Sequence, residues 1–311
     1  MGQRVVPLQS PPPRTGLQRQ VRTVFLVLAA LVSTVLGVAG WIGSERAIHP
    51  PARHYAWRLA DYPDLRPQTI GFDSRTHVAI AGSFFPGSRR TTIVLSHGYG
   101  DNQEQMLPYA EFLHQAGFTV FTYDMRNRGR SGGGAVTLGA LEAIDLISAV
   151  DYLMTRGDID KDRLGALGVS LGAATTLLAA ASDTRIKAVV DDSGFSDAPG
   201  VIATSFEHFI GLPAFPFAPL TVAISEFRAG VNLRQVRPID VVGRIGPRPL
   251  FIIHCMPDRV VPVEHSKRMF EAAKEPKLAW WIPTGGHIQG HVVAPHEYER
   301  RVIEFLDKSL R

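Results

Sequence analysis

Hydrophobic positions alternate between two patterns along most of this chain. Short apolar runs, typical of buried strands, are separated by longer segments with apolar residues at helical spacing. Strands are predicted near residues 70–72, 77–84, 92–96, 119–123, 164–168, 187–191, 249–254 and 278–282. Helices are predicted near residues 103–116, 137–156, 170–182, 263–274 and 294–309. This alternation predicts an α/β domain over residues 69–311, with a mostly parallel eight-stranded sheet and helices on both faces.

The pattern changes near the N-terminus, where residues 23–42 form an uncharged, mostly apolar run. Its length is that of a helix crossing the bilayer core, so a transmembrane helix is predicted. Residues 1–22 contain four arginines and no acid and are predicted to be a disordered tail, and residues 43–68 a linker. A secretory signal peptide is the alternative, because Val38-Ala39-Gly40 resembles a cleavage site. The apolar core of such peptides is usually only about 7–15 residues long.

The distribution of charged residues predicts an orientation in the membrane and argues against a nucleic-acid partner. All 29 acidic residues follow residue 44, so the net charge of +4 comes from the four arginines of the tail among 33 Lys and Arg. Four arginines precede the predicted helix and three, Arg46, Arg53 and Arg58, follow it. Because the side with more arginines usually stays in the cytoplasm, we predict a single-pass protein of the cell membrane with residues 69–311 on the extracytoplasmic side. The balanced remainder has no basic patch signal, so no nucleic-acid partner is predicted. Cys255 is the single cysteine, and no intramolecular disulfide can form.

An insertion interrupts the alternation between Asp192 and Pro249. An insertion after a strand of such a sheet lies at the edge where ligands bind, so residues 195–245 are predicted to form a helical lid. Its aromatic residues are predicted to line the entrance of an apolar acyl pocket. These are Phe206, Phe209, Phe215 and Phe217. The alternative is that they pack on the sheet as part of a covering helix pair.

A sharp turn with serine at its tip joins a predicted strand to a predicted helix. The apolar run of residues 164–167 leads into Gly168-Val169-Ser170-Leu171-Gly172, and helix-forming residues 173–180 follow. Glycine at both flanks lets the strand and helix pass closely, and the serine stands above a helix N-terminus that favours negative charge. Ser170 is therefore predicted to be a nucleophile.

A serine nucleophile needs a histidine to take its proton and a carboxylate to orient that histidine. In enzymes that carry the serine on such a turn, these partners follow it in the order acid, then histidine. Asp258 follows the predicted strand 249–254, and His287 follows the strand 278–282. All three residues leave the sheet at the same edge, which predicts a catalytic triad of Ser170, Asp258 and His287.

The acid has competitors in the sequence, and His287 has a second interpretation. Asp191 and Asp192 end the strand before the insertion and are alternative acids, while Asp258 is alternatively a cap for the helix that follows it. His287 and His291 have the spacing of a zinc-binding pair. The residues between them include a glycine and no glutamate, so no metal site is predicted.

A second motif supplies the groups that bind an oxyanion. The predicted strand 92–95 ends in Ser96-His97-Gly98-Tyr99-Gly100. In a nucleophile-elbow enzyme one backbone N–H comes from the residue after the serine and the other from the loop after this early strand. The predicted oxyanion hole therefore consists of the N–H groups of Leu171 and Tyr99. The alternative for His97-Gly98 is an ordinary turn between a strand and a helix.

These motifs together resemble the α/β-hydrolases of the serine-hydrolase type. The resemblance covers about residues 69–310 and rests on His97-Gly98, Asp124 to Ser131, the serine turn, Asp258 and His287. More narrowly, the chain is similar to bacterial serine aminopeptidase-like hydrolases and to eukaryotic membrane-tethered acyl-protein thioesterases. It departs from them where Cys255 replaces a glycine and where the loop before Ser131 is longer.

The sequence thus predicts a membrane-anchored serine hydrolase that cleaves carboxylic esters or thioesters of a small-molecule or acylated substrate, with no cofactor. A serine peptidase acting on N-terminal residues is the first alternative, and Glu207 and Glu226 are its candidate partners for a substrate amine. The second alternative is a catalytically silent hydrolase fold that serves as a binding module.

Overall fold

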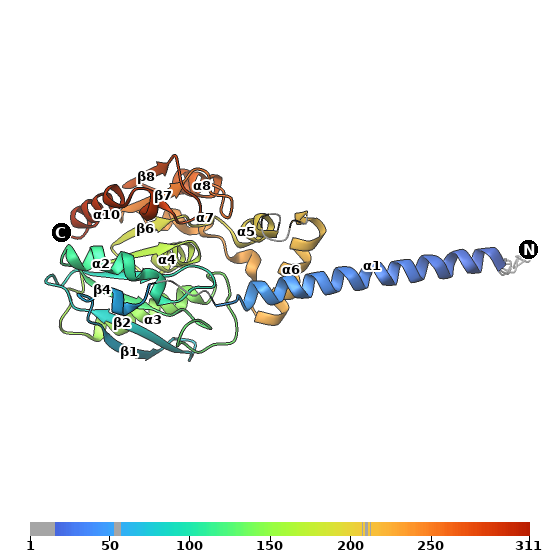
Figure 1. The fold of residues 1–311 in the computed structure, drawn as a ribbon, viewed down its shortest axis with the longest axis horizontal. Helices are drawn as coiled ribbons and strands as arrows, with labels where there is room; N and C mark the ends of the chain where they lie inside the picture. Colours follow the sequence, from blue (N-terminus) through green and yellow to red (C-terminus); the bar gives the residue numbers. More distant parts are fainter. Residues whose placement is uncertain (1–15, 53–56, 207, 209–210, 212) are drawn as a thin grey trace, which may run out of the picture.

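The computed structural model describes residues 16–52, 57–206, 208, 211 and 213–311, and one eight-stranded sheet lies at its centre (Figure 1). The strands are β1 Gln68–Asp73, β2 Ala79–Phe85, β3 Thr92–Ser96, β4 Thr119–Tyr123, β5 Leu164–Val169, β6 Ala188–Asp192, β7 Leu250–Cys255 and β8 Lys277–Ile282. Their order across the sheet is β1-β2-β4-β3-β5-β6-β7-β8. Strand β2 runs antiparallel to both neighbours, and the other neighbouring pairs are parallel. The predicted mostly parallel sheet is confirmed, and the reversal of β2 makes it mixed.

Helices cover both faces of the sheet, as predicted. They are α2 Leu107–Gln115, α3 Glu142–Thr155, α4 Leu171–Ser182, α8 Glu264–Ala272, α9 Gly290–Val293 and α10 Pro295–Ser309. Side chains alternate between the two faces of a strand. Val94 of β3 therefore packs in the cluster that contains α3 and α4, while its neighbours Ile93 and Leu95 pack in the cluster that contains α2 and α10. Because both faces of the sheet are buried, the strands are continuous apolar runs in the sequence.

The predicted lid lies between β6 and β7. It contains α5 Ala198–Ser205, α6 Ala214–Ala229 and the short α7 Pro238–Val241. Helix α6 packs against the N-terminal helix α1, Gly16–Ile48, near the end where α1 joins the domain (Figure 1). The lid thus contacts an element that precedes it by more than 150 residues in the sequence.

Helix α1 extends away from the domain and is long and apolar enough to cross a membrane (Figure 1). It includes the whole predicted span of residues 23–42, part of the predicted tail and the start of the predicted linker. The rest of the tail, residues 1–15, and linker residues 53–56 lie outside the described residues. The last turns of α1 are packed against protein, since Gly40, Gly43, Ser44 and Ile48 are buried.

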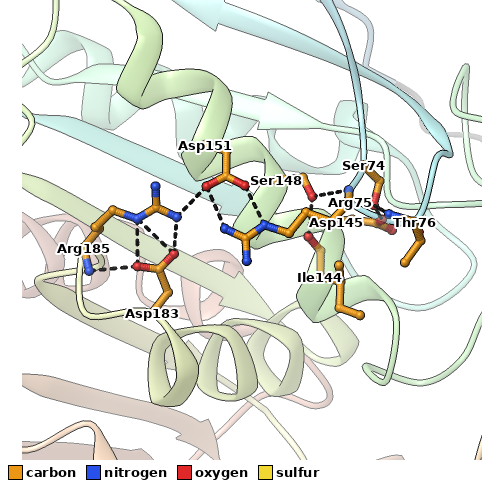
Figure 2. A network of polar contacts seen from close by, with 9 residues as sticks. All are labelled: Ser74, Arg75, Thr76, Ile144, Asp145, Ser148, Asp151, Asp183 and Arg185. Carbon is orange, nitrogen blue, oxygen red and sulfur yellow. Dashed lines mark hydrogen bonds and ion pairs between the residues drawn. The ribbon is translucent and has the colours of Figure 1, made fainter.

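A polar network fixes α3 against its neighbours (Figure 2). Asp151 accepts hydrogen bonds from Arg75 in the β1–β2 turn at 2.7 Å and from Arg185 after α4 at 2.7 Å. Nearer the start of α3, Asp145 is fully buried and accepts a hydrogen bond from Ser74 at 2.6 Å. A buried carboxylate is tolerated when it is hydrogen-bonded, as Asp145 is.

Candidate active site

Ser170 lies at a strained turn between β5 and α4. Its backbone has φ +56° and ψ −117°, a conformation that L-residues rarely adopt. A Cβ at position 168 would collide with the carbonyl of Gly172, and a Cβ at position 172 with the carbonyl of Ser96. The two glycines therefore make the close passage possible, and the strain is stored at the tip of the turn.

The structure brings Ser170, Asp258 and His287 into direct contact. His287 Nε2 lies 2.8 Å from Ser170 Oγ, and His287 Nδ1 lies 2.7 Å from Asp258 Oδ2. A carboxylate can only accept, so Nδ1 carries the proton and Nε2 accepts the hydrogen bond from the serine hydroxyl. This is the arrangement in which a histidine can take a proton from serine.

Asp258 is buried and surrounded by donors. Its Oδ1 accepts hydrogen bonds from the amides of Val260 and Val261 at 2.8 and 2.9 Å, and its Oδ2 faces both His287 and His254. Burial alone would raise the pKa of Asp258, but the hydrogen bonds from His254 and His287 outweigh it and hold this pKa well below its usual range. The carboxyl group therefore stays ionised and in one orientation.

His254, the penultimate residue of β7, contacts the Asp258 carboxylate and was not predicted from the sequence. Its Nε2 donates to the carbonyl of Val261 at 2.8 Å and lies 3.2 Å from Asp258 Oδ2, while Nδ1 lies 2.7 Å from Ser266 Oγ. It is fully buried and positions the Asp258 carboxylate. The sequence feature that indicates this role is a histidine near the end of an otherwise apolar strand, four residues before the predicted acid.

The alternative acids have other partners. Asp192 accepts hydrogen bonds from Tyr298 Oη and Ser193 Oγ, both at 2.8 Å. Asp191 accepts one from the amide of Gly194 at 2.9 Å, and its other oxygen is buried without a hydrogen-bond partner among the described residues. Asp258, not Asp191 or Asp192, is hydrogen-bonded to His287. His291, the second histidine of the zinc-like spacing, pairs with Glu299 at 2.9 Å.

Asp191 makes a pH-dependent contribution to stability. Burial raises its pKa to about 7 from an ordinary value of 3.8. Asp191 therefore ionises near pH 4 in the unfolded chain but only near pH 7 in the folded protein. Because the unfolded chain loses this proton first, the stability of the fold decreases as pH rises from 4 to 7. Asp191→Asn should therefore gain stability relative to the unchanged protein between pH 4 and pH 8. We expect on the order of 1–4 kcal/mol, because each pKa unit is worth about 1.4 kcal/mol.

Asp183→Asn is the control of opposite sign for this measurement. Burial would raise the pKa of Asp183, but its hydrogen bonds with Arg185 outweigh burial and lower it. Its contribution is present above pH 4 and lost in acid, so Asp183→Asn should destabilise the protein more at pH 7 than at pH 3. Denaturant unfolding of the full-length protein in detergent measures both series. A stability difference for Asp191→Asn that is independent of pH would contradict the raised pKa.

The predicted oxyanion residues flank Ser170. Leu171 is the first residue of α4, and the first four N–H groups of a helix have no partner within it. Tyr99 lies in the loop after β3, and its hydroxyl donates to the carbonyl of Arg46 in α1. The same loop is held by His97, whose Nε2 accepts from the amide of Met125 at 3.0 Å. Leu171 and Tyr99 both line the cavity into which Ser170 opens.

This cavity has a volume of about 410 Å³ and is lined mainly by apolar groups. The lid contributes Val201, Ile202, Phe206 and Thr221, and α1 contributes Gly43, Arg46 and Ala47. Ser170, His287, Tyr99 and Leu171 line the same cavity.

Four phenylalanines were predicted to line the entrance, and of those that the structure describes only Phe206 lines the cavity. Phe217 stacks on Phe206 with ring centroids 6.3 Å apart, whereas Phe215 is 79% exposed and outside the cavity wall. The prediction for Phe215 was wrong, because the chain at the start of α6 is extended and directs this side chain to the surface. Phe209 and Glu207 lie outside the described residues, and Glu226 pairs with Arg234.

Comparison with known proteins identifies the family. The sequence model described as the prolyl oligopeptidase family matches residues 104–311, two thirds of the chain. The chain belongs to the prolyl oligopeptidase family. It is a serine hydrolase with the α/β-hydrolase fold, as the sequence motifs predicted.

This member of the prolyl oligopeptidase family is similar in sequence to curated proteins and in fold to solved structures. YqkD of Bacillus subtilis is 30% identical, over 78% of this chain and 77% of its own length. The esterase Pf2001 of Pyrococcus furiosus is 25% identical, with a TM-score of 0.72 over 85% of this chain and 99% of its own. The acylaminoacyl peptidase of Pyrococcus horikoshii is 18% identical with a TM-score of 0.62, over 82% of this chain and 44% of its own, which shows the shared fold alone.

Proposed function

We propose that the protein is a membrane-anchored serine hydrolase that cleaves carboxylic esters or thioesters through an acyl-serine intermediate. The observation that supports this most directly is the hydrogen-bonded series Ser170–His287–Asp258, whose serine and histidine line an apolar cavity. Apolar walls suit an acyl chain, and the polar groups that line the cavity at Ser170 and His287 suit its carbonyl.

The residues have defined roles in this reaction. Ser170 Oγ attacks the carbonyl carbon while its proton moves to His287 Nε2, and the resulting oxyanion accepts hydrogen bonds from the Leu171 and Tyr99 N–H groups. His287 then returns that proton to the departing oxygen or sulfur, which leaves an acyl-serine. Water, deprotonated by His287, attacks this ester and regenerates Ser170. Asp258 orients the imidazole and stabilises its cationic form throughout.

A serine peptidase is the second candidate, and one residue favours it. Asp101 lies on the cavity wall, and a carboxylate there is where a substrate ammonium group would bind. Its Oδ2 accepts a hydrogen bond from Gln105 at 2.7 Å. The family name and the acylaminoacyl peptidase of the same fold are consistent with this candidate. The apolar character of the remaining wall favours the esterase.

Membrane anchoring is proposed from the features of α1. Its apolar run follows Arg19 and Arg22, and Trp41 at the far end lies under the guanidinium of Arg228 at 4.2 Å. Tryptophan is typical of the membrane–water interface, and the greater number of arginines before the helix favours an internal N-terminus and an extracytoplasmic catalytic domain. A cleaved signal peptide remains the alternative, and it would leave the last turns of α1 in place.

A panel of p-nitrophenyl esters of increasing acyl length tests the proposed function. Each methylene that enters the cavity gains up to about 0.8 kcal/mol, roughly fourfold in kcat/KM, until the cavity is filled. The rate should rise over short chains and then level off, and aminoacyl-nitroanilides should react little. Phe206→Ala should weaken this rise, whereas Phe270→Ala, a half-buried aromatic beside Trp281, should not. A higher kcat/KM on nitroanilides that falls in Asp101→Asn would establish the peptidase instead.

A further inference from the structure

The lid and the end of α1 form one packed unit. A Cβ at Gly40 would collide with Leu220 and Ile224 of α6, and a Cβ at Gly43 with Thr221 and Phe206. Farther along α6, Arg228 forms an ion pair with Glu45 and donates to Ser44 Oγ at 3.2 Å. At 1.5 Å per residue, the apolar span of residues 23–42 measures about 30 Å, the thickness of a bilayer core. Helix α6 therefore crosses α1 where this span ends (Figure 1).

The outward face of α6 is apolar, which is unusual for a helix on a protein surface. Pro219, Ala223 and Phe227 are exposed and recur at every fourth residue, so they share one side of the helix, and exposed Phe215 stands at its start. Phe215 and Phe227 are 79% and 88% exposed. We call these four residues the α6 stripe. A surface helix normally has polar residues on its outer side.

The charges of α6 are confined to its last turn. Glu226 pairs with Arg234, and Arg228 pairs with Glu45 beside Trp41. An apolar stripe next to a membrane span, with a tryptophan and an arginine at the boundary, has the composition of a helix that lies in the lipid interface.

We propose that the α6 stripe contacts the lipid surface and that the cavity receives the acyl chain of a lipid ester from this membrane. This inference rests on the proposed esterase function and on α1 as the anchor. Its second support is that the two elements at the membrane boundary also form the cavity wall. Gly43, Arg46 and Ala47 of α1 face Phe206 and Thr221 of the lid, within the same cavity as Ser170. An acyl chain in this cavity therefore lies beside the elements that meet the bilayer.

A double substitution separates lipid contact from catalysis. Phe215→Glu/Phe227→Glu should lower kcat/KM by tenfold or more for a fluorogenic glycerolipid ester in phosphatidylcholine vesicles. Hydrolysis of soluble p-nitrophenyl acetate should change less than twofold, because neither side chain lines the cavity. Leu278→Glu is the matched control, since Leu278 is 54% exposed on the edge strand β8. Equal effects on the two substrates, or no loss with the lipid ester, would overturn the proposal.

A second readout does not depend on catalysis. A fluorophore attached to Ala223→Cys should be quenched by spin-labelled lipids in vesicles, while one attached to Leu278→Cys should not, and buried Cys255 is protected from labelling. Quenching at position 223 in a protein that hydrolyses no ester would refute the proposed function and the lipid substrate but support the lipid contact. No quenching, with cross-linking of two copies through position 223, would show that a second copy covers the stripe.

The anchor has its own control in these experiments. All variants should remain in the membrane fraction after alkaline carbonate washing, because α1 is unchanged. Recovery of a shorter soluble form beginning near Trp41 would show a cleaved signal peptide and overturn both the anchor and the lipid contact.

Discussion

Ser170→Ala should abolish turnover and labelling by a fluorophosphonate while the protein stays folded. The substitution removes the Oγ atom that lies 2.8 Å from His287 Nε2, and alanine keeps the Cβ that packs in this turn. Loss of the nucleophile of a serine triad typically lowers kcat by about 10⁶-fold. Initial rates on p-nitrophenyl esters and gel detection of the labelled protein measure the effect.

Ser193→Ala is the matched control. Ser193 is also buried and also has a positive φ, of 61°, but its hydroxyl donates to Asp192 and does not contact His287. Its variant should be labelled like the unchanged protein. Normal labelling of Ser170→Ala would show that another residue is the nucleophile, and no labelling of the unchanged protein would favour a catalytically silent binding module.

Asp258→Asn should lower kcat by about 10⁴-fold, the effect of the matching change in a serine triad. The amides of Val260 and Val261 donate to Oδ1 and would hold the asparagine oxygen there. The NH₂ group then faces His287 Nδ1, which must accept a hydrogen bond instead of donating one. Nε2 would carry the ring proton and could no longer receive the proton of Ser170.

Asp192→Asn tests the alternative acid with the same chemical change. Asp192 contacts Tyr298 and Ser193, so we expect a change in kcat of less than tenfold together with some loss of stability. A severe loss in Asp192→Asn with a mild one in Asp258→Asn would reverse the assignment of the acid. Thermal unfolding of both variants separates loss of activity from loss of fold.

Patterns that act over short stretches of sequence predicted most of the fold. The alternation of strands and helices, the glycines that flank Ser170 and the apolar run of α1 depend on neighbouring residues. The sequence therefore indicated the α/β-hydrolase fold, the position of the lid, the nucleophile and the order of its partners. Local patterns predict secondary structure because backbone sterics and the burial of one face of a strand or helix depend on residues a few positions apart.

Contacts between distant segments decided the rest. Three carboxylates lie at the ends of β6 and β7, and only the folded chain shows that Asp258 contacts His287 while Asp191 and Asp192 turn to other partners. His254 supports the acid from within β7, and this role depends on how the loop after the strand folds back. The cavity wall contributed by α1 was likewise invisible in the sequence. It depends on the absence of side chains at Gly40 and Gly43, which lets α6 approach the helix closely, and such packing between remote elements has no local signal.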